Sequence, residues 1–195
     1  VMPHAPNGFS VSVFARVPDA GWMAVAPNGD VFISVPTTGK ILLLRGKDGA
    51  GGADGIEIFA TGFQAPHGLV LHDGRLYVSD RRSVWVGPYT DGAVSGGKPQ
   101  KVIAAAGSPE DKAVARDLAF DSRGNFYWGF AGPRGGLAVP GPDATIQKVA
   151  PDGTAATFAD GLNTVAGLSF YPGTDKLFAL VDERNGLGPG LVPDY

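Results

Sequence analysis

The sequence predicts an all-β protein, and two observations carry this prediction. The chain of 195 residues contains 30 glycines and 16 prolines, scattered between short apolar runs. Glycine and proline distributed in this way are expected where tight turns join many short strands. The second observation is an internal repeat in which two apolar segments flank a polar turn. With 44% hydrophobic and 18% charged residues, the chain is also predicted to be an ordered globular protein.

The repeat occurs four times, at residues 22–34, 68–79, 117–129 and 167–179. Each copy predicts a hairpin, because glycine in the turn supplies the positive φ that tight turns need and the flanks are β-branched or aromatic. Equivalent positions are separated by 45, 50 and 51 residues, counted between Val31, Leu76, Phe126 and Leu177. Repeats of roughly 40–50 residues are typical of the blades of a β-propeller.

Further strands are expected beside these hairpins. Third strands are predicted at residues 41–44, 84–86 and 146–149, and outer strands at 9–15, 56–60, 101–104 and 156–159. Four strands per blade is the propeller arrangement. We therefore predict one partial propeller domain over residues 1–195, with approximate blades at 8–46, 55–90, 100–150 and 154–195, the last one incomplete. An incomplete blade leaves an unpaired edge, so either the chain is a segment of a longer propeller or a second chain completes the sheet.

Composition excludes several function classes. The formal charge of -3, with 16 dispersed Lys and Arg residues, argues against nucleic-acid binding. No apolar run approaches the roughly 18 residues of a membrane span. The absence of cysteine excludes disulfides and thiolate chemistry, and no Ser and His residues stand in a recognisable triad order. The first residues, VMPHAPNG, lack the basic and apolar regions of an export signal, so we expect any such signal to have been removed already.

Several runs, in order, resemble the N-terminal half of the glucose/sorbosone dehydrogenase family. They lie at residues 8–15, 23–32, 39–45, 66–69, 118–120 and 167–170. The resemblance implies a six-bladed propeller, of which this chain would be about half, exported to the periplasm or secreted. It also implies pyrroloquinoline quinone (PQQ) and Ca²⁺ over the central channel and a small-molecule sugar as substrate. In that family a base removes a sugar hydroxyl proton while hydride passes to the quinone.

The position of the family's catalytic base is altered in this chain. The resemblance places a His-x-x-Arg pattern before the inner strand of the third blade, where Arg116 matches the Arg, which makes it a candidate cofactor-binding residue, and Ala113 occupies the His position. A methyl group cannot accept a proton. His67, which lies between Pro66 and Gly68 and just before a strand, is a substitute base or ligand; alternatively it is a turn histidine satisfied by the backbone.

The family's cofactor residues are also changed. Where the resemblance implies an Arg-Asn pair that holds the quinone, this chain has Asn163 and Thr164, with Val165 in place of the following Pro. Neutral side chains make weaker hydrogen bonds to a carboxylate than an Arg fork does. Asp182 is the candidate calcium ligand, in a segment that retains fewer carboxylates than in relatives, whereas hard cations need several oxygen ligands.

Three functional hypotheses remain open. The first is a PQQ-dependent sugar or aldose dehydrogenase, degenerate at the catalytic His and the quinone-binding Arg. The second is a non-catalytic propeller that binds a carbohydrate or a protein partner. The third is a calcium-dependent lactonase-type propeller, which would need a different set of carboxylates. The tryptophans Trp22, Trp85 and Trp128 could stack on sugar, but at hairpin positions they are expected to fill the cores between blades.

Overall fold

The computed structural model describes residues 3–46, 52–104, 114–131 and 144–182, and their strands form antiparallel sheets. The first sheet consists, in spatial order, of β1 (Met23–Val25), β2 (Val31–Val35), β3 (Lys40–Gly46) and β4 (Ala53–Thr61). The second sheet repeats this order with β5 (Leu69–His72), β6 (Arg75–Ser79), β7 (Ser83–Pro88) and β8 (Gln100–Ala104).

The third sheet has the same plan, and a fourth is represented by its first hairpin. The third contains β9 (Val114–Phe120), β10 (Phe126–Ala131), β11 (Ile146–Val149) and β12 (Ala155–Ala159). The fourth contains β13 (Thr164–Phe170) and β14 (Leu177–Asp182). A single pairing between Ala131 and Thr164 joins the fourth sheet to the third.

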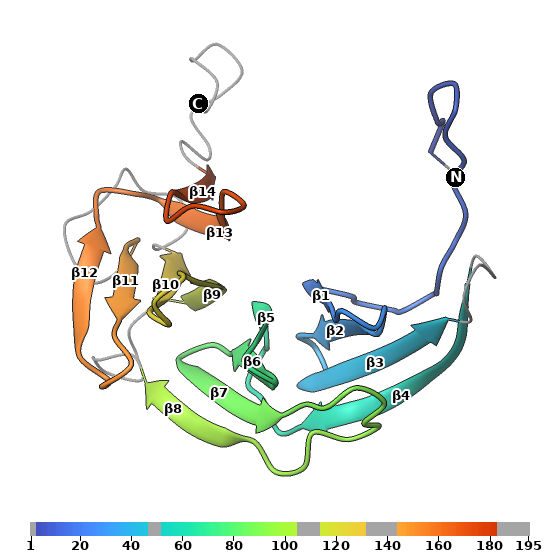
Figure 1. Ribbon diagram of the computed structural model, residues 1–195, viewed down its shortest axis with the longest axis horizontal. Helices are drawn as coiled ribbons and strands as arrows, with labels where there is room; N and C mark the ends of the chain where they lie inside the picture. The colour runs from blue at the N-terminus through green and yellow to red at the C-terminus, as the bar shows by residue number, and fades with distance from the viewer. Residues whose placement is uncertain (1–2, 47–51, 105–113, 132–143, 183–195) are drawn as a thin grey trace.

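The sheets fan around an open arc. Figure 1 shows β1, β5, β9 and β13 toward the inside of the arc and β4, β8 and β12 toward the outside. This radial order of antiparallel sheets is the architecture of a β-propeller, so the predicted fold class is confirmed. The alternative of hairpins stacked face to face in a sandwich does not occur.

Apolar cores lie between successive sheets. Between the first and second sheets the core includes Phe32, Ile41, Leu43, Phe59, Leu69, Leu76 and Val78. Between the second and third it includes Val84, Leu118, Phe126, Trp128, Phe130 and Val149. Between the third and fourth it includes Ala119, Tyr127, Ile146, Val165 and Leu168. Each sheet therefore buries both faces, one against the preceding sheet and one against the following sheet, except at the two ends of the arc.

The four predicted hairpins and the three predicted third strands are present. The turn glycines adopt the expected conformation, with φ of 87° at Gly29 and 79° at Gly124. The strands β3, β7 and β11 cover the predicted third positions, and β4, β8 and β12 cover three of the predicted outer positions. The pattern of turn residue and alternating side chains therefore located these strands correctly.

Residues 9–15 differ from the prediction, because they are not part of a strand. The outer edge of the first sheet is taken by β4, which follows β3 in the chain and pairs with it from Lys40 to Gly46. Residues 9–15 instead run in extended form past the ends of these strands, where the Ala53 amide donates to the Phe14 carbonyl at 2.7 Å. The sheets thus span 23–61, 69–104 and 114–159, each with its outer strand last in chain order.

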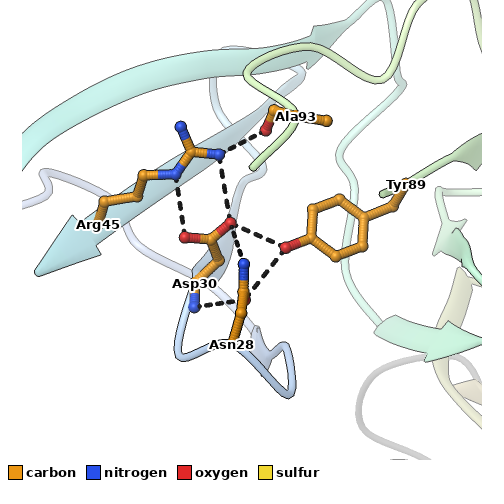
Figure 2. A network of polar contacts seen from close by, with 5 residues as sticks. All are labelled: Asn28, Asp30, Arg45, Tyr89 and Ala93. Carbon is orange, nitrogen blue, oxygen red and sulfur yellow. Dashed lines mark hydrogen bonds and ion pairs between the residues drawn. The ribbon is translucent and has the colours of Figure 1, made fainter. Parts of the chain in front are cut away.

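A buried polar network ties the first sheet to the second (Figure 2). Arg45 on β3 donates to both carboxylate oxygens of Asp30, at 3.0 and 3.2 Å, and to the Ala93 carbonyl at 2.7 Å. The Tyr89 hydroxyl donates to the same carboxylate at 2.8 Å, and Asn28 stands beside it. Burial disfavours the charged form of Asp30, and the hydrogen bonds from Arg45 and Tyr89 offset this cost, so the satisfied network orients the first sheet against the second.

No helix in the described ranges is long and apolar enough to cross a bilayer.

Candidate functional site

Three half-buried side chains meet where the inner strands of the first three sheets begin. Trp22 precedes β1, His67 precedes β5, and Arg116 lies near the start of β9. The rings of Trp22 and His67 meet edge to face, with centroids 4.7 Å apart. Arg116 Nη1 lies 3.0 Å from His67 Nε2. We call these three residues the rim cluster.

Backbone contacts within the second sheet and between the second and third sheets hold the rim cluster in place. The His67 amide donates to the Ser79 carbonyl at 2.8 Å, and the Gly68 amide donates to the Arg116 carbonyl at 2.9 Å. The approach requires glycine at position 68, because a Cβ there would lie 2.7 Å from the Arg116 carbonyl oxygen. The strands β5 and β9 are therefore in direct contact at the point where His67 and Arg116 leave the backbone.

The surroundings of His67 keep its imidazole neutral. Burial, together with the nearby charge of Arg116, lowers the pKa of His67 to about 4. An arginine only donates hydrogen bonds, so Nε2 accepts from Arg116 and the ring proton resides on Nδ1. Nδ1 is buried and has no hydrogen-bond partner among the described residues. Neither nitrogen is therefore presented to a ligand as a free base.

Asp117 follows Arg116 of the rim cluster on the inner strand β9. Its carboxylate accepts the Leu168 amide of β13 at 2.8 Å, which links the third sheet to the fourth. A Cβ on Gly68 would come within 2.8 Å of the carboxylate, and one on Gly167 within 3.9 Å. Burial raises the pKa of Asp117, against the lowering effect of its backbone hydrogen bonds. The carboxyl group on β9 is thus hydrogen-bonded to β13 and lies close to β5 at Gly68.

A cavity of about 310 Å³ opens beside these inner strands. Its lining combines the apolar side chains of Trp22, Met23, Leu69, Leu168 and Phe170 with the polar side chains of Asp117 and Ser169. Ligand sites typically combine an apolar wall with a few convergent polar groups. Of the rim cluster, Trp22 lines the cavity whereas His67 and Arg116 do not, so Trp22 is the residue that connects the two parts of the candidate site.

The predicted cofactor and metal residues are not gathered at this site. Asn163 is buried, with 7% of its surface exposed. Thr164 pairs with Ala131 on one side and with Asp182 at the end of β14 on the other. Asp182 is exposed, and the segment that follows it lies outside the described residues, as does Ala113. Of the predicted cofactor residues, Arg116 alone belongs to the rim cluster.

These residues do not fit a PQQ or calcium site. Of the three predicted quinone ligands, only Arg116 is charged, and its guanidinium already contacts His67. No group of three or more Asp, Glu or His side chains within the described ranges is placed to hold a metal ion, whereas Ca²⁺ takes six to eight oxygen ligands. The described part of the chain therefore supplies neither cofactor with a full set of contacts.

The tryptophans divide between core and site. Trp128 is buried at 2% exposure in the core between the second and third sheets, and Trp85 packs against the core between the first and second. Trp22 instead lies in the rim cluster.

Sequence reasoning missed Asp117 as a residue of the site. The aligned hairpins offer a signal that could have found it, because Asp117 stands at the position that Gly68 and Gly167 occupy in their own hairpins.

Fold and site together define a partial β-propeller with a candidate small-molecule site at the inner ends of its sheets. No family model and no curated protein matches the sequence. Solved structures do match. The PQQ-bound aldose sugar dehydrogenase of Streptomyces coelicolor is 20% identical, with a TM-score of 0.65, and the match covers 87% of this chain and 58% of that one. The holo PQQ domain of a pyranose dehydrogenase from Coprinopsis cinerea is 12% identical, with a TM-score of 0.63, covering 77% and 41%.

Propellers of another activity match as well. A gluconolactonase from Xanthomonas campestris is 15% identical, with a TM-score of 0.59, and the match covers 83% of this chain and 54% of that one. This chain thus spans about half the length of the propellers it resembles. At such identities the likeness establishes the fold and does not decide between oxidoreductase and lactonase.

Proposed function

We propose that this chain is part of a propeller of the PQQ-dependent sugar dehydrogenase type that binds a sugar at the rim cluster. The observation behind the proposal is the meeting of Trp22, His67 and Arg116 at one rim. An indole face packs well against the C–H groups of a sugar ring, and a guanidinium donates to its hydroxyl groups. The family resemblance further leads us to place the protein in the periplasm or outside the cell.

In this proposal the described residues bind the sugar but do not oxidise it. A general base must come within hydrogen-bond reach of the hydroxyl proton that it removes. In His67, Nε2 accepts from Arg116 and Nδ1 is buried. The pKa of about 4 also makes His67 a weak base at neutral pH. Ala113, at the family's base position, has no group that accepts a proton.

A sugar titration tests the proposal. The purified chain is titrated with a panel of aldoses and followed by calorimetry and tryptophan fluorescence. Trp22→Ala is expected to weaken binding about tenfold, which corresponds to about 1.4 kcal/mol for a lost aromatic contact. The matched control is Tyr171→Leu, an exposed aromatic residue of the turn between β13 and β14. Equal affinities for wild type and Trp22→Ala would remove the rim cluster as the site.

The second candidate is an active dehydrogenase, favoured by the fold likeness to two PQQ-containing structures. PQQ would serve as hydride acceptor, and the missing base and quinone contacts would come from outside the described residues. The test adds PQQ and Ca²⁺ to the chain and measures dye reduction over the same aldoses. We expect none. Sugar-dependent dye reduction would establish the dehydrogenase and contradict the binding-only role.

A lactonase remains the third hypothesis. The fold likeness to a gluconolactonase supports it, but a calcium-dependent lactonase requires a carboxylate set that the described residues lack. Lactone hydrolysis that depends on added Ca²⁺ and stops with a chelator would favour this activity over both others.

A further inference from the structure

A second cavity lies between the second and third sheets, each of which has a further sheet on its other side. Its volume is about 440 Å³, larger than that of the cavity beside the inner strands, and Phe120 lines both. His72 at the end of β5 and Phe120 at the end of β9 belong to its lining. In contrast, His67 precedes β5 and Arg116 lies near the start of β9. The cavity therefore lies at the opposite ends of these strands from the rim cluster, beside the hairpin turns, and we call it the turn cavity.

Four aromatic rings in the lining of the turn cavity pack on one another. The His72 imidazole stacks on the Phe120 ring, with centroids 4.1 Å apart and ring planes inclined by 11°. The rings of Tyr77 and Phe126 pack against the same phenyl ring, with centroids 4.7 and 5.7 Å away. Aromatic rings bury large apolar areas against other rings. This part of the lining therefore suits a flat aromatic ligand.

Between the first and second sheets, the corresponding space is filled by side chains of the protein. Tyr89 follows β7 and is 4% exposed. Its ring packs edge to face on Phe32 and Phe59, with centroids 5.0 and 6.1 Å away. Its hydroxyl donates to the Asp30 carboxylate at 2.8 Å. A phenol side chain thus closes the space between the first two sheets.

The residues that correspond to these three rings one sheet further along all line the turn cavity. Aligned by strand register, they are Tyr77, Val102 and Pro151. Val102 corresponds to Phe59, because each stands at the bulge of its outer strand, and Pro151 corresponds to Tyr89. Valine and proline are smaller than the side chains whose positions they take. The turn cavity therefore occupies the place of two aromatic side chains.

The polar groups of the lining come from the two hairpin turns. The side chains of Asp73 and Arg123 are 86% and 77% exposed. Asp73 lies 3.4 Å from His72 Nε2, and Arg123 lies 3.8 Å from Asp175, but exposed pairs of this kind contribute little. A carboxylate only accepts and a guanidinium only donates, whereas a hydroxyl does both. A neutral hydroxyl therefore suits this pair, and a charged ligand group would be repelled by one of the two.

We propose that the turn cavity binds a small phenol, with its ring against the four aromatic rings and its hydroxyl toward Asp73 and Arg123. The ligand has the chemistry of the Tyr89 side chain, which fills the corresponding space one sheet earlier and donates its hydroxyl to Asp30. The cavity volume falls within the range of about 300–1,000 Å³ that is typical of small-molecule sites. This site is separate from the sugar site proposed at the rim cluster, and neither proposal depends on the other.

A titration with p-cresol, the side chain of tyrosine as a free molecule, tests the proposal. Binding to the chain is followed by NMR through the ring protons of His72 and His67. The ring current of the bound phenol should shift the His72 signals saturably, because His72 lines the turn cavity. The His67 signals should not move. Toluene lacks the hydroxyl and should bind about fivefold more weakly, the effect of one hydrogen bond. The anion p-toluate should also bind more weakly than p-cresol.

Variants that refill the cavity provide the matched test. Val102→Phe supplies the ring that Phe59 provides one sheet earlier, and Pro151→Tyr supplies the ring of Tyr89. Each should weaken p-cresol binding about tenfold or more, while circular dichroism and thermal melts show that the chain is folded. The control is Ile56→Phe on β4, where the exposed fraction of 48% is close to the 45% of Val102. It should bind p-cresol like the wild type.

Several outcomes would overturn the proposal. These are the absence of a saturable shift at His72, a shift at His67 in its place, and tighter binding of p-toluate than of p-cresol. Wild-type affinity in a folded Val102→Phe or Pro151→Tyr variant would refute it as well, and if one of the two does not fold, the other decides.

Discussion

Gly68 is the position where the close approach of neighbouring sheets is most sharply testable. A Cβ added there would lie 2.7 Å from the Arg116 carbonyl oxygen and 2.8 Å from Asp117 Cα. Non-bonded heavy atoms prefer separations of about 3.5–4.0 Å, so Gly68→Ala must push β5 and β9 apart by about 0.7 Å or more. The obstructing atoms are backbone, which cannot rotate away as a side chain could.

The cost of Gly68→Ala has two parts. The shift lengthens the 2.9 Å bond from the Gly68 amide to the Arg116 carbonyl beyond hydrogen-bond range, a loss of about 1 kcal/mol. Overpacking adds about 1–3 kcal/mol. We therefore expect a destabilisation of about 3 kcal/mol, which lowers the melting temperature of a chain of this size by about 6–12 °C.

The measurement is urea unfolding and thermal melting of Gly68→Ala beside a matched control. Gly55→Ala lies on β4 with nothing within 4 Å of the added Cβ, and it should be neutral or gain up to about 1 kcal/mol. If Gly68→Ala is as stable as Gly55→Ala, β5 and β9 do not approach as closely as described. The positions derived for His67, Arg116 and Asp117 would then be wrong as well.

Four further predictions concern buried polar groups. Tyr89→Phe removes a 2.8 Å hydrogen bond to a buried carboxylate and should cost about 1–3 kcal/mol in urea unfolding. Burial alone would raise the pKa of Asp30, but hydrogen bonds from Arg45 and Tyr89 outweigh it and hold the pKa below its ordinary value. The ionised Asp30 therefore stabilises the folded state above pH 3.8, and this stabilisation is lost as the pH falls through the folded pKa. In Asp30→Asn, the free energy of unfolding should consequently depend less on pH in the acid range than in the wild type. His67 should titrate near pH 4 by NMR, and its contribution to stability, complete above pH 6.5, should decline as the pH falls toward 4. Arg116→Gln should raise the pKa of His67 without restoring 6.5, because burial is the larger cause.

The repeating elements of the fold could be predicted because their signals are local. Each hairpin is encoded within about a dozen residues by a turn glycine and alternating apolar positions. The outer strand of the first sheet was harder. Residues 9–15 and 53–61 both have the composition of a strand, and which of them pairs with β3 depends on chain connectivity. Pairing of β3 with β4 needs only a short connection, and it is therefore favoured over pairing of β3 with residues 9–15, which would need a longer one.

The candidate site was only partly predictable. The contact between His67 and Arg116 joins residues 49 apart in the chain, and no local pattern in either segment indicates it. The family resemblance singled out Arg116 as a cofactor-binding residue, and the place of His67 just before a strand made it either a substitute base or a turn histidine. The structure shows instead that the two residues contact each other, a relation that only the radial arrangement of sheets could reveal.

The repeat also explains how one scaffold produces a single site. Trp22, Gly68, Asp117 and Gly167 occupy the same position in successive hairpins, and His67 and Arg116 are equivalent to each other one residue earlier. The backbone has the same course in each sheet, so function must come from the positions at which the side chains differ between the repeats. A Cβ at position 68 would lie 2.8 Å from the Asp117 carboxylate, so the glycine there leaves the carboxylate its space, whereas a Cβ at position 167 would lie 3.9 Å away, an ordinary contact distance. A carboxylate at position 68 or 167 as well would bring like charges together in a partly buried space, which is unfavourable. Of these four equivalent positions, only 22 and 117 carry a side chain, and they place an indole and a carboxyl group in the lining of the cavity, beside apolar side chains that include Phe120 and Phe170.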